Sequence, residues 1–176
     1  ALTINSSTAV LIEDPTATLG APWSQAIVNS LTDSSAAVIE AGSISSVTIG
    51  GSGLTASSTY EAGQFVYQSF TGDGVLTAYF PAGIPSDGNA RYALMVRAST
   101  GNNVVMAAAV TSSNTGFGTK LYSRTSAGGY STETTANTLV ISRWVRLIRS
   151  GNTFSAETSP DGVTWTSVGT ATLASM

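Results

Sequence analysis

Residues 143–169 read RWVRLIRSGNTFSAETSPDGVTWTSVG, and this stretch decides the fold. Its apolar residues fall in short runs that two turn signals separate, Ser150-Gly151-Asn152 and Ser159-Pro160-Asp161-Gly162. Proline presets the backbone for a turn, and glycine readily takes the positive φ that such turns require. The stretch therefore predicts three consecutive antiparallel strands, near 139–149, 153–158 and 163–168.

Short β-rich runs of the same kind precede this stretch. No segment keeps helical apolar spacing beyond two turns, and the best helical candidate is 23–31. Many short strands with glycine-rich turns predict an all-β fold, either an antiparallel sandwich or a barrel. Ser and Thr suit the solvent face of such sheets, whereas aliphatic and aromatic residues suit the inner face. The additional predicted strands are 64–70, 75–80, 91–98, 104–111 and 120–125.

The composition excludes several function classes. The 176-residue chain has no Cys and no His, which removes disulfides, thiol nucleophiles, Cys/His zinc sites and Ser-His-Asp triads. With 7 basic and 10 acidic residues and a net charge of −3, it has no basic surface for nucleic acid or an anionic membrane. The dense apolar run from Val104 to Val110 is far shorter than the roughly 20 residues that span a bilayer.

The amino-acid composition also indicates where the protein is located. The 51 Ser and Thr residues and 18 Gly residues favour a β-rich scaffold of the extracellular type. The sequence begins at Ala1 instead of Met, which is expected of a processed secreted protein or of a trimmed chain. We therefore expect the protein outside the cell or at the cell surface.

The hairpin pattern of residues 143–169 resembles that of bacterial concanavalin-like jelly-roll modules, which are often attached to secreted enzymes and surface proteins. The likeness covers about residues 19–173. It implies a two-sheet jelly-roll sandwich of the lectin or glucanase type, and it supplies no catalytic set. Such modules are commonly assumed to bind glycans. The other matching segments are Leu19 to Gln25, Ala41-Gly42-Ser43, Gly51-Ser52-Gly53-Leu54, Phe65-Val66-Tyr67-Gln68, Gly72-Asp73-Gly74 and Leu94-Met95-Val96-Arg97.

The chain departs from this family at both ends. It stops at Met176 without the one or two apolar strands that usually complete the sandwich, and an extra segment precedes the module start. Within that segment, residues 7–13 form a predicted strand, about 20 Å long for six residues. We expect an N-terminal strand extension that donates a strand over 1–14, a linker over 15–22 and the sandwich over 23–176. The expected subunit-contact residues are Thr8, Val10, Leu11 and Ile12.

A sandwich that lacks a strand exposes core side chains and unpaired backbone groups, which a strand supplied from elsewhere would satisfy. If the strand folds back into its own domain, the product is a monomer with permuted topology. If it enters a neighbour, the head-to-tail contact does not close and a filament results. The prolines at both ends of the linker, Pro15 and Pro22, favour an outward projection and hence exchange. A chain whose missing strands exist in nature is the third alternative.

The acidic residues form no catalytic pattern. Glycoside hydrolysis needs two facing carboxylates, and no strand carries the Glu-x-Asp-x-x-Glu arrangement of concanavalin-like glucanases. Asp73, Asp87 and Asp161 lie in Gly-containing turns, where Asp caps the turn, and none begins an EF-hand-like calcium loop. Glu157 is expected to pair with an Arg across a hairpin. We predict no enzymatic activity, no catalytic or metal-binding residue and no cofactor.

Aromatic rings at the surface are the groups that would stack on a sugar. The candidates are Tyr92, Tyr122, Tyr130, Trp144 and Trp165. Aromatic residues within strands usually belong to the core. Tyr130 follows Gly128-Gly129 in a loop-like stretch, so it is the candidate glycan-binding residue. Asn5 begins the sequence's single Asn-x-Ser/Thr sequon and is a candidate glycosylation site.

The sequence thus predicts a non-enzymatic structural subunit of an extracellular filament or surface appendage. It would polymerise with identical subunits, head to tail, by N-terminal donor-strand complementation. The alternative is a monomeric carbohydrate-binding or adhesion module, with glycans as the partner. Neither nucleic acid nor a membrane span is expected.

Overall fold

A computed structural model describes residues 2–3, 24–28, 36–40, 43–48, 59, 63–80, 91–112, 116–135 and 144–176, with side chains for residue 59 and from residue 67 onward. These residues form strands and turns, and none of them is helical. The strands are β1 (Leu2–Thr3), β2 (Ser24–Val28), β3 (Ala36–Glu40), β4 (Ser43–Thr48), β5 (Gly63–Tyr67), β6 (Gly74–Tyr79), β7 (Tyr92–Arg97), β8 (Met106–Thr111), β9 (Thr119–Arg124), β10 (Thr132–Thr135), β11 (Trp144–Ser150), β12 (Thr153–Ser159) and β13 (Thr166–Thr172).

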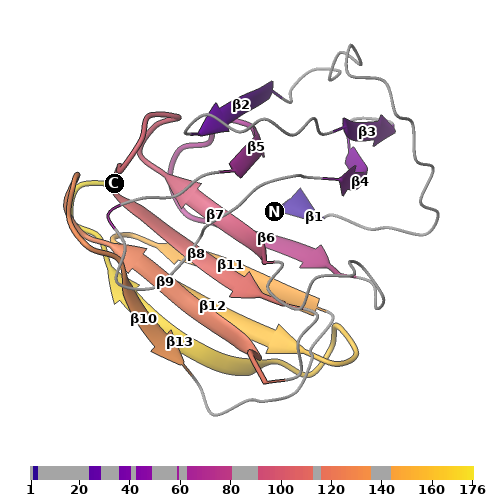
Figure 1. Cartoon of the computed structure of the whole chain (residues 1–176). Helices are drawn as coiled ribbons and strands as arrows, with labels where there is room; N and C mark the ends of the chain where they lie inside the picture. Colours follow the sequence, from indigo (N-terminus) through magenta and orange to yellow (C-terminus); the bar gives the residue numbers. More distant parts are fainter. Residues whose placement is uncertain are drawn as a thin grey trace.

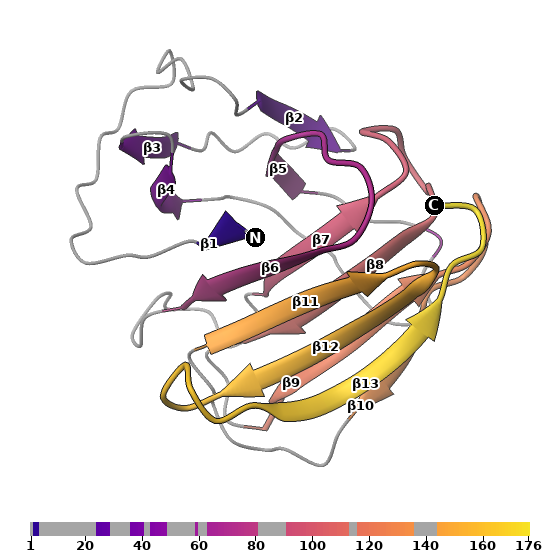
Figure 2. The ribbon, with the colours of Figure 1, turned by 180° about the vertical axis from the view of Figure 1, so that it is seen from behind.

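Two sheets stack face to face (Figures 1 and 2). The first has the order β1-β6-β11-β12-β13, and the second has the order β10-β9-β8-β7. All neighbouring strands in both sheets run antiparallel except β1, which pairs with β6 in parallel. Two separate two-stranded sheets, β2–β5 and β3–β4, lie near the β6 and β7 side of the sandwich. The predicted all-β, antiparallel two-sheet sandwich is confirmed.

The core lies between the two sheets, and strand alternation builds it. In β11, Val145 and Leu147 point inward and are fully buried, and in β12 Phe154 and Ala156 do the same. Strand β8 contributes two alanines to this core, whose small size lets the sheets approach each other. The remaining buried members of the cluster are Ala78, Leu94, Val105, Leu121, Val168 and Leu173.

The two sides of the sandwich differ. On the β10 and β13 side the sheets almost touch, because a Cβ built on Gly169 would lie 2.5 Å from Cγ2 of Thr134. On the β6 and β7 side, Leu76, Phe80 and Val96 pack against the core but are only partly buried. We call this second side the open edge, defined by β6 and β7. Strand β1 lies there, beside β6 (Figure 2).

Local turn chemistry sets the strand ends, as the sequence predicted. Gly151 takes a φ of +57° between β11 and β12, and Gly162 takes +76° between β12 and β13. The last strand begins at Thr166, three residues later than predicted. The reason is that the carboxylate of Asp161 accepts the backbone amides of Val163 and Thr164 and holds them in the loop.

Two sequence predictions on secondary structure were wrong or incomplete. The helical candidate 23–31 contains strand β2, which pairs with β5. Its apolar run is too short to prefer helix, and pairing with a distant strand decides the outcome. Strand β10 was not predicted, because its Thr-Glu-Thr-Thr sequence has no apolar alternation; all four residues are exposed at the edge of the sheet.

Among the described residues, no helix has the length and apolar character needed to cross a membrane.

Candidate functional site

The outer face of the β11–β13 sheet carries a group of aromatic and charged side chains. Trp144, Arg146 and Ile148 alternate with the buried Val145 and Leu147 of β11, so they lie on the outer face. Each of the three is partly exposed. The expectation that aromatic residues in strands belong to the core is therefore wrong for Trp144.

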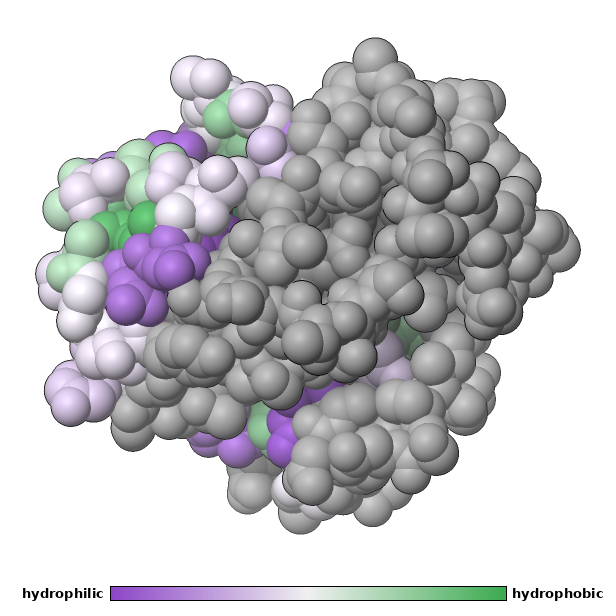
Figure 3. All heavy atoms as spheres, turned by 45° about the horizontal axis from the view of Figure 1, so that its top comes forward, coloured by the Kyte–Doolittle hydropathy of each residue, from purple (hydrophilic) through white to green (hydrophobic). Residues whose placement is uncertain are grey.

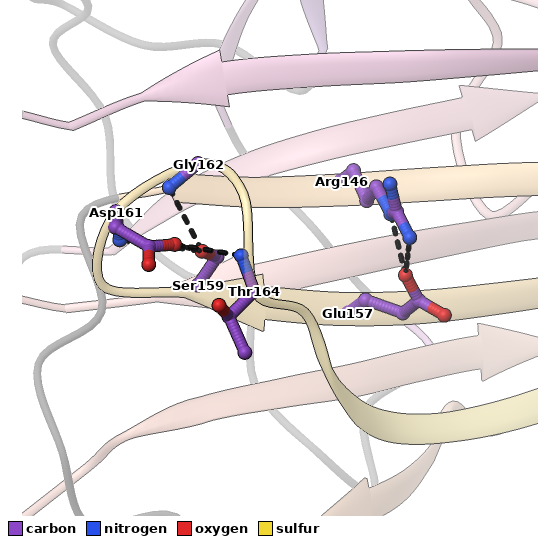
Figure 4. A network of polar contacts seen from close by, with 6 residues as sticks. All are labelled: Arg146, Glu157, Ser159, Asp161, Gly162 and Thr164. Atoms are coloured by element: carbon purple, nitrogen blue, oxygen red, sulfur yellow. Dashed lines mark hydrogen bonds and ion pairs between the residues drawn. The ribbon is translucent and has the colours of Figure 1, made fainter.

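Arg146 and Glu157 face each other across the β11–β12 ladder. Their side chains form an ion pair with a hydrogen bond from Arg146 Nε to Glu157 Oε2 (Figure 4). The guanidinium also lies over the ring of Trp165, 4.1 Å from its centroid. The predicted cross-hairpin pairing of Glu157 is confirmed.

The loop from Ser159 to Trp165 is held by its own polar groups. Asp161 Oδ1 accepts the backbone amides of Val163 at 2.8 Å and Thr164 at 2.7 Å, and the Ser159 hydroxyl donates to it at 2.8 Å. Ser159 Oγ in turn accepts the amide of Gly162 at 2.8 Å (Figure 4). The amides of Thr164 and Val163, followed by the Ser159 hydroxyl, lower the pKa of Asp161 from 3.8 to about 2. The predicted role of Asp161 as a turn cap is confirmed.

This loop packs directly on the outer face. A Cβ on Gly162 would lie 3.0 Å from Cε2 of Trp144, so the loop backbone covers one side of the indole. The ring of Tyr79 covers another side, with centroids 5.1 Å apart. The Trp144 and Trp165 rings are thus already in contact with protein groups. The cluster chiefly anchors the loop and offers little free ring surface for stacking on a sugar.

Tyr130 is the aromatic residue that the sequence singled out, and its side chain is 71% exposed. The other tyrosine candidates differ from it: Tyr122 is buried, and Tyr92 stacks against Phe80 with centroids 5.5 Å apart. Burial raises the pKa of Tyr92. The prediction that Tyr130 lies outside the core is confirmed, whereas its role in glycan binding stays a prediction.

A rigid loop presents Tyr130. The buried Arg124 donates from Nε to the carbonyl of Gly129 at 2.9 Å and from Nη1 to the carbonyl of Val104 at 3.2 Å. The amide of Gly128, whose φ is +73°, donates to the carbonyl of Asn103 at 2.8 Å. Buried charge-assisted hydrogen bonds of this kind fix the backbone on both sides of the loop.

A second ion pair lies on the outer face of the other sheet. Lys120 Nζ donates to Glu133 Oε1 at 2.7 Å, and Thr135 donates to the same oxygen at 2.7 Å. Desolvation raises the pKa of Glu133, but the hydrogen bonds from Lys120 and Thr135 outweigh it and leave the pKa below its ordinary value. Among the described residues, no three acidic, His or Cys side chains come together as metal ligands.

Strand β1, near the N-terminus, pairs with β6 at the open edge. In β1, Leu2 pairs with Leu76 and Thr3 pairs with Thr77 of the same chain. The predicted donor-strand residues Thr8, Val10, Leu11 and Ile12, together with the sequon at Asn5, lie outside the described residues, as do most of segments 1–14 and 15–22. The sequence did not predict the pairing of Leu2 and Thr3, because two residues carry no strand signal by themselves.

Over the described residues, the chain forms a β-sandwich in which β1 extends the first sheet beside β6 and the ion pairs lie on the outer faces. The family models, the curated proteins and the solved structures compared with this chain gave no match. The functional proposals below therefore depend on geometry and sequence alone.

Proposed function

We propose that this chain is a non-enzymatic structural subunit of an extracellular filament or surface appendage. The N-terminal segment of one subunit adds as a strand to the open edge of the next. The observation that carries the proposal is the pairing of Leu2–Thr3 with β6 of the same chain, since an N-terminal strand adds at this position. Within one chain this pairing gives the monomer described above, and the proposal is that the same pairing forms between neighbouring subunits. A strand that adds to a sheet edge gains main-chain hydrogen bonds irrespective of its sequence.

Incomplete burial at the same edge supports the proposal. Leu76, Phe80 and Val96 are partly buried core residues there, whereas the opposite side is closed by the contact between Gly169 and Thr134. An added strand with apolar side chains beside β6 would increase the burial of these three residues. The predicted donor segment offers Val10, Leu11 and Ile12, and each would contribute roughly 1.5–3 kcal/mol on full burial.

The surface chemistry is compatible with a structural role. The chain has no His or Cys, the carboxylate of Glu157 is paired with Arg146, and hydrogen bonds lower the pKa values of Glu133 and Asp161. A contact from the N-terminus of one subunit to β6 of another joins different surfaces. Such heterologous contacts generate open filaments unless the rotation closes a ring.

The test compares the full chain with a variant that lacks residues 1–14, by sedimentation and electron microscopy. We expect filaments from the full chain and monomers from the truncated one. A finer pair of variants uses strand alternation: Val10→Asp with Ile12→Asp alters one face of the donor strand, and Leu11→Asp alters the other. Because only one face meets the core, the two variants should differ in assembly. Monodisperse monomers of the intact chain would refute the proposal.

A second candidate function is a monomeric carbohydrate-binding or adhesion module. The observation that favours it is the 71% exposure of Tyr130 on a rigid loop. A ring of this kind can stack on a pyranose. Binding on a glycan array that is lost in Tyr130→Ala would support this function, and an array without signal would count against it.

A further inference from the structure

Among the side chains that the structure describes, one buried polar atom has no hydrogen-bond partner, and this atom is Oδ1 of Asn103. Buried polar atoms in proteins are nearly always paired, because an unpaired one loses its bonds to water without replacement. The exceptions call for an explanation, such as a group that binds from outside the chain. Asn103 therefore needs a donor that the described residues do not supply.

The backbone conformation of Asn103 does not require its amide. Asn103 has a φ of +55°, and it is the one non-glycine residue with a positive φ in the described part of the chain. Asparagine adopts this left-handed region more readily than most residues, but glycine adopts it without steric cost. Asn103→Gly therefore keeps the turn and removes only the unpaired group.

Asn103 belongs to one of two neighbouring loops that we call the loop pair, residues 98–105 between β7 and β8 and residues 125–131 between β9 and β10. The structure describes both loops completely. They lie at the end of the sandwich that holds the C-terminus, at the left in Figure 1. On that side in Figure 3, the described surface has hydrophobic residues beside hydrophilic ones.

Hydrogen bonds join the two loops into one rigid unit. The backbone amide of Gly128 donates to the carbonyl of Asn103 at 2.8 Å. The buried Arg124 donates from Nη1 to the carbonyl of Val104 at 3.2 Å and from Nε to the carbonyl of Gly129 at 2.9 Å. One guanidinium thus fixes the backbone next to Asn103 in the first loop and the backbone before residue 130 in the second.

Tyr130 supplies an apolar surface beside this acceptor. It is 71% exposed and lies two residues after Gly128, which is bonded to Asn103. Sites for small molecules combine aromatic surface with a few fixed polar groups that select the orientation of the ligand. A pyranose ring has a matching construction, since it carries C–H groups on its faces and hydroxyl groups around its edge.

The charge of the loop pair indicates an uncharged ligand. Residues 98–105 and 125–131 contain no Lys, Arg, Asp or Glu. The two arginines that border the loops are bonded to loop carbonyls. Arg124 is buried, and Arg97 donates to the carbonyls of Ser99 at 3.2 Å and Gly101 at 2.6 Å. The acceptor and the ring therefore suit a neutral hydroxyl compound better than an anion.

Resting on the carbohydrate-binding function given above as the second candidate, we infer that the loop pair binds a neutral saccharide and that Asn103 selects one of its hydroxyl groups. Tyr130 stacks on the sugar ring, and Oδ1 of Asn103 accepts the proton of the hydroxyl. The terminal torsion of asparagine is soft, so the amide turns toward the ligand without a change in the backbone. Because Oδ1 is already out of water in the free protein, the new hydrogen bond replaces no bond to solvent.

An array that displays glucose, mannose, galactose and the monodeoxy forms of each sugar tests this inference on the full chain. We expect one deoxy form to need an about tenfold higher protein concentration for half-saturation than its parent sugar, as for the loss of one buried hydrogen bond. Asn103→Gly should bind the parent sugar about tenfold more weakly and no longer distinguish it from that deoxy form. Asn103→Asp keeps an acceptor oxygen and should retain the distinction.

The matched control is Asn152→Ala, which removes an exposed amide from the turn between β11 and β12 and should bind like the wild type. The melting temperature of Asn103→Gly should equal that of the wild type, because the turn does not depend on the amide. A drop in the melting temperature together with unchanged sugar selection would assign Asn103 a structural role and overturn the inference.

The outcomes separate the inference from the function on which it rests. Binding that is lost in Tyr130→Ala but keeps its selection among deoxy sugars in Asn103→Gly overturns the role of Asn103 and leaves carbohydrate binding standing; the donor to Oδ1 is then water only. A signal confined to charged glycans overturns the inference in the same way. Silence on this array and on a broad glycan array overturns both.

Discussion

Replacing Gly169 with alanine tests whether the sandwich is closed on its β10 and β13 side. The new Cβ would lie 2.5 Å from Cγ2 and 3.2 Å from Cβ of Thr134, so either the side chain or a sheet must shift. Overpacking of this kind costs about 1–3 kcal/mol. Replacing a glycine within a strand by alanine increases the free energy of unfolding by about 0.5–1 kcal/mol, because glycine loses more backbone entropy on folding. We therefore expect Gly169→Ala to lower the free energy of unfolding by about 1–2 kcal/mol.

A double-mutant cycle isolates the contact from the other effects of the substitution. Thr134 is exposed, so Thr134→Ala alone should change stability by no more than about 0.5 kcal/mol. In the double variant, the loss of Cγ2 relieves the clash, and the coupling should be favourable by about 1 kcal/mol. Urea unfolding of the four proteins measures it. Additivity within about 0.3 kcal/mol would show that the sheets do not touch here, and the argument that the β10 and β13 side is closed would fail.

Three further perturbations test the core, the loop and the outer face. Phe154→Ala removes a fully buried ring and should cost about 3–5 kcal/mol in urea unfolding; a cost below about 1 kcal/mol would contradict its central position. Because the folded-state pKa of Asp161 is depressed to about 2, its stabilising effect is complete above its ordinary pKa of 3.8 and is lost as the pH falls toward 2. The difference in unfolding free energy between the wild type and Asp161→Ala should therefore shrink between about pH 4 and pH 2, and a constant difference would refute the cause assigned to it. Arg146→Ala should cost more than Glu157→Gln, because it removes the stacking on Trp165 as well as the ion pair, and only the ion-pair part should weaken in high salt.

Local turn chemistry was the part of the fold that the sequence predicted best. Positive φ at Gly151 and Gly162, and the Asp161 cap, depend on residues within a few positions of one another. The pattern of residues 143–169 contained all of them. The edge strand β10 and strand β2 were missed or misassigned for the opposite reason, since each is fixed by a partner strand elsewhere in the chain.

The candidate site could be predicted only in part. The pairing of Glu157 with an arginine was predicted from the hairpin, but β11 carries two arginines, one on each face, and the two faces have similar sequences. Packing against the second sheet determines which face of β11 is exposed. It covers Val145 and Leu147 and leaves Trp144 and Arg146 on the outer face. The exposure of Tyr130 was predictable because the Gly-Gly pair before it marks a loop. The rigidity of the Tyr130 loop was not predictable, because it depends on hydrogen bonds from Arg124 to the carbonyls of Gly129 and Val104 in two different loops.

The number of strands predicted from the sequence does not determine where an N-terminal strand pairs. The resemblance to jelly-roll modules implied a spare N-terminal strand, but it did not identify the sheet edge to which such a strand adds. The structure assigns that edge through three partly buried residues, Leu76, Phe80 and Val96, and through the parallel register of Leu2 with Leu76. A strand parallel to β6 runs in the same direction as β6, so its free N-terminus lies near Gly74 and its continuation into the donor subunit leaves beyond Tyr79. A strand donated by a neighbour in the same register would therefore come from a subunit that lies beyond the end of β6, past Tyr79.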